Sequence, residues 1–143
     1  MQDSPIVDPS LVRLDLKAED RETALRRTAE LLAADPRLGN WEEFWLSIGG
    51  RQVVELADSA GRAILAHGRG PSVRELALAA ARWSAPDGPR LVFVFAIPAA
   101  MSEEYLRKVG ALARICREPE KLAALLTAAA PGEFAGLLGA WME

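Results

Sequence analysis

Cysteine and histidine are among the scarcest residues of this 143-residue chain, which contains one of each, Cys116 and His67. A single cysteine excludes an internal disulfide and a zinc site built from several thiolates. Because Cys116 lies among apolar residues in a helical pattern, we expect it to be a small core residue. Any chemistry that needs an imidazole depends on His67.

Long apolar runs and a charge imbalance of one sign are also missing. No stretch approaches the ~18 consecutive apolar residues that span a bilayer, and the N-terminus lacks the basic start and apolar core of a signal peptide. We therefore expect a cytoplasmic protein without membrane insertion. The formal net charge is −3 and the arginines are scattered, which argues against nucleic acid as a partner.

Half of the residues are hydrophobic, which is enough to bury a core of ordinary size. The length predicts one domain. We place it at residues 11–143, after an irregular lead-in over residues 1–10 that contains two prolines.

Apolar patterning predicts both strands and helices. Residues 11–16 alternate as in a half-buried strand, and the continuous β-branched and aromatic run at 91–97 predicts a central strand covered on both faces. Helices are expected where capping residues or prolines precede apolar residues at helical spacing. Their predicted ranges are 20–34 with Asp20 as cap, 41–48 with Asn40 as cap, a continuation at 51–56, and helices beginning at Ser102, Pro119 and Pro131.

The apolar run at 63–66 leads directly to His67, and the chain then reads Gly-Arg-Gly-Pro over residues 68–71. The run predicts a short buried strand, whereas the glycines and the proline predict a loop. We therefore expect His67 at the end of a strand, beside Arg69. Function is often carried by side chains placed in this way on a rigid scaffold. Composition and periodicity alone lead only to an α/β domain with one suggestive histidine.

Several short motifs in a fixed order carry further information. Residues 20–25 read Asp-Arg-Glu-Thr-Ala-Leu, and residues 61–69 read Gly-Arg-Ala-Ile-Leu-Ala-His-Gly-Arg. The remaining motifs are Arg51-Gln52, the apolar run that ends at Pro98, Glu104-Tyr105-Leu106 and Arg117-Glu118-Pro119.

In their order and spacing these motifs resemble the type-2 enzyme IIA domain of the bacterial phosphoenolpyruvate-dependent sugar phosphotransferase system. This is the mannitol/fructose class, which includes the nitrogen-regulatory enzyme IIA proteins. The resemblance extends from about Leu11 to Trp141 and needs one additional residue before His67. It implies an α/β sandwich of one domain, with a small mixed β-sheet flanked by helices. It also implies a strand over residues 73–84, although the alanines there favour a helix.

The resemblance implies that His67 accepts a phosphoryl group from a phosphohistidine carrier protein and passes it to a further protein, which the sequence does not identify. An imidazole offers an unprotonated nitrogen near neutral pH, and phosphoryl transfer depends on positioning and charge neutralisation. The candidates for phosphate stabilisation are Arg51, Arg69 and Tyr105. No metal and no cofactor are implied.

Three departures from the family pattern leave the activity open. Ala66 stands in place of a proline, Gln52 in place of a glutamate, and Tyr105 in place of the second histidine. The alternative is a non-catalytic regulatory module that binds a partner protein on the same fold. A third hypothesis is an unrelated α/β enzyme with His67 as general base, although no acidic partner stands at a recognisable spacing.

Overall fold

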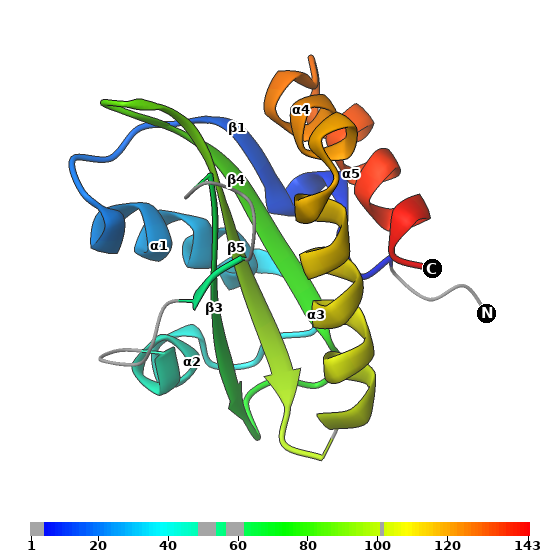
Figure 1. The fold of residues 1–143 in the computed structure, drawn as a ribbon. Coiled ribbons are helices and arrows are strands. Elements are labelled where there is room, and N and C mark those ends of the chain that lie inside the picture. Colours follow the sequence, from blue (N-terminus) through cyan, green and yellow to red (C-terminus); the bar gives the residue numbers. More distant parts are fainter. Residues whose placement is uncertain (1–4, 49–53, 57–61, 101) are drawn as a thin grey trace.

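The computed structural model describes residues 5–48, 54–56, 62–100 and 102–143, drawn in colour in Figure 1. Its centre is one five-stranded sheet with the order β1-β4-β5-β3-β2. The pairs β1–β4 and β3–β5 are parallel, whereas β4–β5 and β2–β3 are antiparallel. The strands are β1 (Val12–Leu16), β2 (Val54–Glu55), β3 (Ala63–Gly70), β4 (Ala77–Ala85) and β5 (Gly88–Pro98).

Helices cover both faces of this sheet (Figure 1). On one face lie α1 (Arg21–Glu30), continued by the 3-10 helix η2 (Leu31–Ala34), and α2 (Trp41–Ile48). On the other face lie α3 (Ser102–Arg117), α4 (Pro119–Thr127) and α5 (Pro131–Trp141). A short 3-10 helix, η1 (Pro9–Leu11), precedes β1. The predicted α/β sandwich with a mixed sheet is confirmed.

The core consists of two apolar layers, because successive side chains of a strand point to opposite faces. In β5, Phe93 and Phe95 belong to the layer under α3–α5, whereas Val92 and Val94 belong to the layer under α1 and α2. All four are fully buried. The prediction of a central strand covered on both faces is therefore confirmed.

The alanine-rich segment forms β4, as the resemblance implied. Residues 77–81 are all buried, and β4 pairs with β1 on one side and with β5 on the other. Pairing along both edges outweighs the helix propensity of alanine, which is a weak preference that tertiary context overrides. The hairpin between β4 and β5 turns at Pro86-Asp87 and continues through Gly88, whose φ of +121° favours glycine.

The helix starts follow their capping residues. The Asp20 carboxylate accepts a hydrogen bond from the backbone N–H of Thr23, and the Asn40 side chain accepts one from that of Glu43. Cys116 is buried on α3 as expected, and burial raises the pKa of its thiol to about 12. In the described part of the chain, no helix is long and apolar enough to cross a membrane.

Two local predictions are wrong. Residues 68–70 were expected in a loop, with His67 at the end of the strand. They instead continue β3, because Gly68, Arg69 and Gly70 pair in register with the end of β5, so His67 lies within the strand. Residues 54–55 were expected in a helix, but they form β2, which pairs antiparallel with Ile64 and Leu65. Residues 51–53 of the predicted 51–56 helix and residues 1–4 of the predicted lead-in lie outside the described residues.

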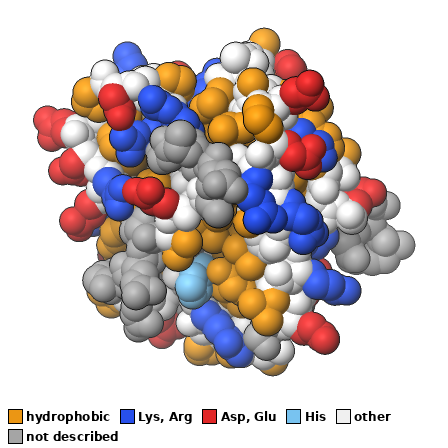
Figure 2. Space-filling model, in the orientation of Figure 1, with side chains coloured by type: hydrophobic (Ala, Val, Ile, Leu, Met, Phe, Trp, Pro, Cys, Tyr) orange, Lys and Arg blue, Asp and Glu red, His pale blue; other side chains and the backbone are white. Residues whose placement is uncertain are grey.

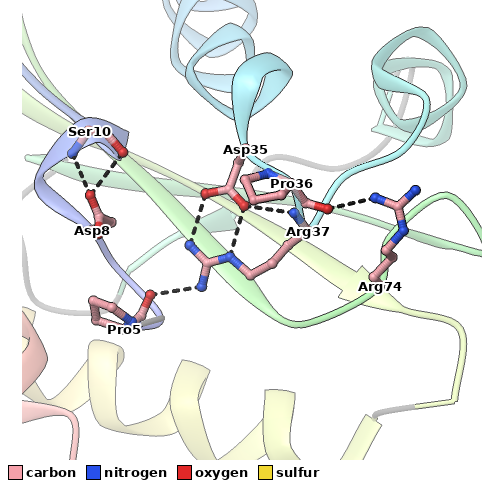
Figure 3. A network of polar contacts seen from close by, with 7 residues as sticks. All are labelled: Pro5, Asp8, Ser10, Asp35, Pro36, Arg37 and Arg74. Atoms are coloured by element: carbon pink, nitrogen blue, oxygen red, sulfur yellow. Dashed lines mark hydrogen bonds and ion pairs between the residues drawn. The ribbon is translucent and has the colours of Figure 1, made fainter. Parts of the chain in front are cut away.

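A polar network that is buried at Asp35 and Arg37 ties three segments together (Figure 3). Both Asp35 and Arg37 have side chains that are 7% exposed, and the carboxylate accepts hydrogen bonds from Nε and Nη2 of Arg37 at 2.9 and 3.0 Å. Arg37 Nη1 donates to the carbonyl of Pro5 at 2.8 Å, and Arg74 Nη1 donates to the carbonyl of Pro36 at 2.6 Å. The N-terminal segment, the α1–α2 connection and the β3–β4 connection are thus joined by polar contacts.

Candidate functional site

His67 lies on β3 with its side chain exposed, between a buried Ala66 and a buried Gly68. Strand alternation puts it on the same side of the sheet as Leu65, under the α3–α5 layer. Its register partner on β5 is Phe95. In Figure 2 the pale blue histidine, the only one in the chain, is visible at the surface beside hydrophobic side chains. The strand backbone holds its position, and the imidazole remains accessible.

Tyr105, in the first turns of α3, is the residue that the structure brings to His67. Its hydroxyl oxygen lies 3.5 Å from His67 Nδ1, and the two ring centroids are 5.4 Å apart. The tyrosine ring also contacts Phe95, edge to face, with 5.2 Å between the ring centroids. Burial raises the pKa of the Tyr105 hydroxyl, so the phenol is neutral at physiological pH.

Arg69 follows His67 on the same side of β3, at a separation of about 6.6 Å along the strand. Its side chain is exposed, and Nε donates to the carbonyl of Ala99 at 3.0 Å, with Nη2 donating to the same oxygen. This contact orients the guanidinium toward the connection after β5 and does not use Nη1. Arg51, the other predicted guanidinium, lies outside the described residues.

Gly68 brings helix α2 against the strand that carries His67. A Cβ atom at this position would lie 2.5 Å from Ser47 Oγ and 2.6 Å from Phe44 Cε1. Real Cβ atoms do not come this close, so the packing of α2 on β3 requires glycine here. Sequence reasoning identified the Gly-Arg-Gly segment as a loop and therefore missed this role.

Phe95 is the second residue of the site that the sequence alone did not reveal. The sequence predicts it only as part of an apolar central strand, which gives no information on its neighbours. In the structure Phe95 neighbours both residues of the site, His67 as its register partner on β3 and Tyr105 through the ring contact. Its contribution is to fix the tyrosine ring, which in turn fixes the hydroxyl next to the imidazole.

The chemistry that this arrangement can perform is nucleophilic attack by an accessible imidazole. When Nδ1 carries the ring proton, it donates to the Tyr105 oxygen and the lone pair lies on Nε2. Arg69 lies on the same side of the strand, with its guanidinium bonded to the carbonyl of Ala99. Because His67 is exposed, a reacting group can reach its imidazole from solvent, which a buried histidine would not allow.

Comparison with known proteins agrees with this architecture. No protein-family model matches the sequence, and no curated protein matches it. Among solved structures, the fold is similar to the nitrogen regulatory protein IIA-Ntr of Neisseria meningitidis, with a TM-score of 0.75 and 19% identity over 93% of this chain and 96% of that one. It is also similar to a protein of Streptococcus mutans assigned as a PTS IIA, with a TM-score of 0.61 and 16% identity over 91% of this chain and 87% of that one.

The chain therefore has the fold of the enzyme IIA proteins of the phosphotransferase system. This confirms the resemblance seen in the sequence motifs at the level of the fold. At these identities the likeness concerns the backbone architecture, and the chemistry rests on the residues of this chain.

Proposed function

We propose that this protein is a phosphoryl carrier of the enzyme IIA type, with His67 as the acceptor. The observation that supports this most directly is the exposed His67 imidazole on strand β3 of an enzyme IIA fold, with the Tyr105 hydroxyl 3.5 Å from Nδ1. The phosphoryl donor is a phosphohistidine carrier protein. In the transfer, the N–P bond of the donor breaks as a new N–P bond forms at His67.

The surrounding residues take distinct parts in this proposal. The Tyr105 hydroxyl oxygen accepts a hydrogen bond from the Nδ1–H group of His67, which leaves the lone pair on Nε2 for the incoming phosphorus. Arg69 neutralises charge on the equatorial oxygens of the transferred phosphoryl group through Nη1, the guanidinium nitrogen that is not bonded to the carbonyl of Ala99. Arg51 is proposed for the same task from its motif position alone. No metal ion is part of this scheme.

The test is a labelling assay with phosphoenolpyruvate and the two upstream phosphotransferase components. The wild-type protein is expected to acquire an acid-labile, base-stable phosphate, and His67→Gln is expected to acquire none. His67→Gln keeps a polar side chain of similar size at an exposed position, so its fold is checked by circular dichroism. Label that persists in His67→Gln would contradict the assignment of the acceptor.

The second candidate function is a regulatory module that binds a partner protein without phosphotransfer. It is favoured by Tyr105 in the place of a second histidine, since a neutral phenol supplies no positive charge near the imidazole. Under this alternative the wild-type protein takes no label while an enzyme IIA control labels normally in the same reaction.

A further inference from the structure

The first turns of helix α3 carry Tyr105 but have few buried side chains to hold them in place. Between Pro98, the last residue of β5, and Ala111, none of the side chains that the structure describes is buried. The buried residues of α3 begin with Ala111 and Leu112, in the second half of the helix. Because a helix in a protein is stabilised mainly by the packing of its apolar face, the start of α3 depends on a small number of specific contacts for its position.

One of these contacts ties the β5–α3 connection to the strand that carries His67. Arg69 Nε donates to the carbonyl of Ala99 at 3.0 Å, and Nη2 donates to the same oxygen. Ala99 directly follows β5, three residues before α3 begins at Ser102. Arg69 lies on β3, two residues after His67. In Figure 1, α3 begins beside the ends of β3 and β5, and the guanidinium joins the two segments there.

The hydrogen bond between Tyr105 and His67 is sensitive to the position of the helix start. The hydroxyl oxygen and Nδ1 are 3.5 Å apart, which is close to the largest separation at which such groups form a hydrogen bond. Phe95 contacts the tyrosine ring, but the separation from Nδ1 also depends on where the backbone of α3 begins. Displacement of the helix start by about 1 Å away from β3 would therefore break the hydrogen bond.

We propose that Arg69 is a positioning residue, which acts on His67 through Tyr105. Its contact with the Ala99 carbonyl holds the start of α3 and thereby keeps the Tyr105 hydroxyl next to the imidazole. The consequence for catalysis rests on the proposed function, in which this hydroxyl accepts a hydrogen bond from Nδ1–H and leaves the lone pair on Nε2. Arg69 thus has a task in the unphosphorylated protein, in addition to the neutralisation of phosphoryl charge through Nη1.

The chain permits a direct measurement, because it contains one histidine and one tyrosine. The imidazole nitrogen signals in NMR spectra therefore belong to His67, and they report the ratio of its Nδ1–H and Nε2–H forms. The measurement is made on the unphosphorylated protein at about pH 8.5, where a histidine is ordinarily neutral and a tyrosine keeps its proton. We expect the ratio of Nδ1–H to Nε2–H to fall about threefold or more in Arg69→Gln, because the hydrogen bond that favours Nδ1–H is lost.

Arg74→Gln is the matched control for this substitution. Arg74 is an exposed arginine on the β3–β4 connection, and it also donates to a backbone carbonyl, that of Pro36, at 2.6 Å. Its replacement removes the same charge but a contact with the α1–α2 connection, so the ratio of the two imidazole forms should stay as in wild type. Thermal unfolding shows that both variants are folded. An unchanged ratio in Arg69→Gln, a shift toward Nδ1–H, or an equal shift in Arg74→Gln overturns the proposal.

A double-variant cycle shows whether Arg69 acts through Tyr105. Tyr105→Phe removes the hydroxyl, so Arg69→Gln should change the ratio by less than about 1.5-fold in this background, because the two residues then no longer share an effect on the imidazole. A direct effect of the guanidinium charge on the imidazole would persist at full size in the Tyr105→Phe background. That result would overturn the positioning role.

The positioning role and the proposed function can fail separately. A wild-type protein that takes no label contradicts the proposed function. The ratios of the imidazole forms are measured without any phosphotransferase component, so they decide the positioning role in that case as well. A shift in Arg69→Gln that is absent from Arg74→Gln and from the Tyr105→Phe background supports the positioning role with or without phosphotransfer.

Discussion

Gly68 is the residue at which the His67 strand and helix α2 come closest. Introducing Ala at this position puts a Cβ within 2.6 Å of the Ser47 and Phe44 side chains, and Phe44 is fully buried and cannot turn into solvent. Overpacking of this kind costs about 1–3 kcal/mol. We expect Gly68→Ala to lower the free energy of unfolding by that amount in urea denaturation followed by tryptophan fluorescence.

Gly70, two residues further along β3, is the matched control for this prediction. A Cβ atom there has no heavy atom within 4 Å, and alanine loses less backbone entropy than glycine in a strand. Gly70→Ala should be neutral or stabilise the protein by about 0.5 kcal/mol. Equal destabilisation by both substitutions would show that the strand, and not the contact with α2, requires glycine.

Tyr105 tests the hydrogen bond to the candidate acceptor. Tyr105→Phe removes the hydroxyl near Nδ1 and keeps the edge-to-face contact with Phe95. A hydrogen bond contributes about 0.5–1.5 kcal/mol, so we expect the rate of His67 labelling to fall roughly 3- to 10-fold with unchanged thermal stability. Tyr105→His, which restores the residue of the family pattern, should label at least as fast as wild type. Labelling of Tyr105→Phe at the wild-type rate would remove the hydroxyl from the mechanism.

At the scale of elements, short sequence patterns correctly predicted the helices and strands whose position depends on residues close together in the chain. Asp20 and Asn40 each cap the helix that follows them, and the apolar run at 91–97 forms the middle of the sheet. The error at Gly68-Arg69-Gly70 has a different origin. Two of these three residues are glycines, which are common in turns, yet all three pair with Ala96, Ile97 and Pro98 of β5. Pairing between residues 28 apart in the sequence leaves no trace in a local pattern.

In the candidate site, too, the sequence predicted the identity of the residues but not their contacts with distant segments. His67 was identified because it is the only imidazole, and Tyr105 and Arg69 followed from the family resemblance. The support of Tyr105 by Phe95 and the contact of Arg69 with Ala99 depend on segments distant in the chain. The sequence therefore predicted the candidate side chains His67, Tyr105 and Arg69, whereas the contacts that hold Tyr105 and Arg69 in place are visible only in the fold.

Helix α2 depends on its N-terminal cap, because it spans eight residues and isolated helices of that length are not stable in water. The Asn40 side chain accepts a hydrogen bond from the backbone N–H of Glu43 at 3.0 Å. Asn40→Ala should cost about 1 kcal/mol of stability, whereas Asn40→Asp should be neutral or stabilising. The comparison is made by urea denaturation. An unchanged stability of Asn40→Ala would mean that packing of Phe44 and Ile48 alone sets the start of α2.

At the scale of the whole molecule, Arg37 links the α1–α2 connection, where Asp35 holds its guanidinium, to the N-terminal segment at the carbonyl of Pro5 (Figure 3). Loss of one partner leaves a buried charge without compensation, which typically costs about 3–5 kcal/mol. Arg37→Met is therefore expected to lower the free energy of unfolding by about 3 kcal/mol. The double variant Asp35→Asn/Arg37→Met should lose less than the sum of the single variants, because the two side chains share one interaction.

The same pair gives the protein a specific response to acid. The hydrogen bonds from Arg37 hold the pKa of Asp35 below its usual value, against the opposing effect of burial. A lowered pKa in the folded state means that the unfolded chain takes up its proton first as the pH falls. The stabilisation by Asp35 is thus complete above about pH 4, the usual range of this carboxyl, and is lost as the pH decreases through the lower pKa of the folded state.

Asp35→Asn should remove this response. At pH 7 the variant is expected to be about 2 kcal/mol less stable than wild type, because it lacks charge-assisted hydrogen bonds to a buried guanidinium. Below pH 4 the difference should shrink steadily in urea titrations at successive pH values. Asp15→Asn is the control, since the Arg13–Asp15 pair has side chains that are 57% and 79% exposed and surface pairs contribute little. A constant difference between wild type and Asp35→Asn from pH 7 to pH 2 would mean that the Asp35 carboxylate stabilises the fold by its shape and not by its charge.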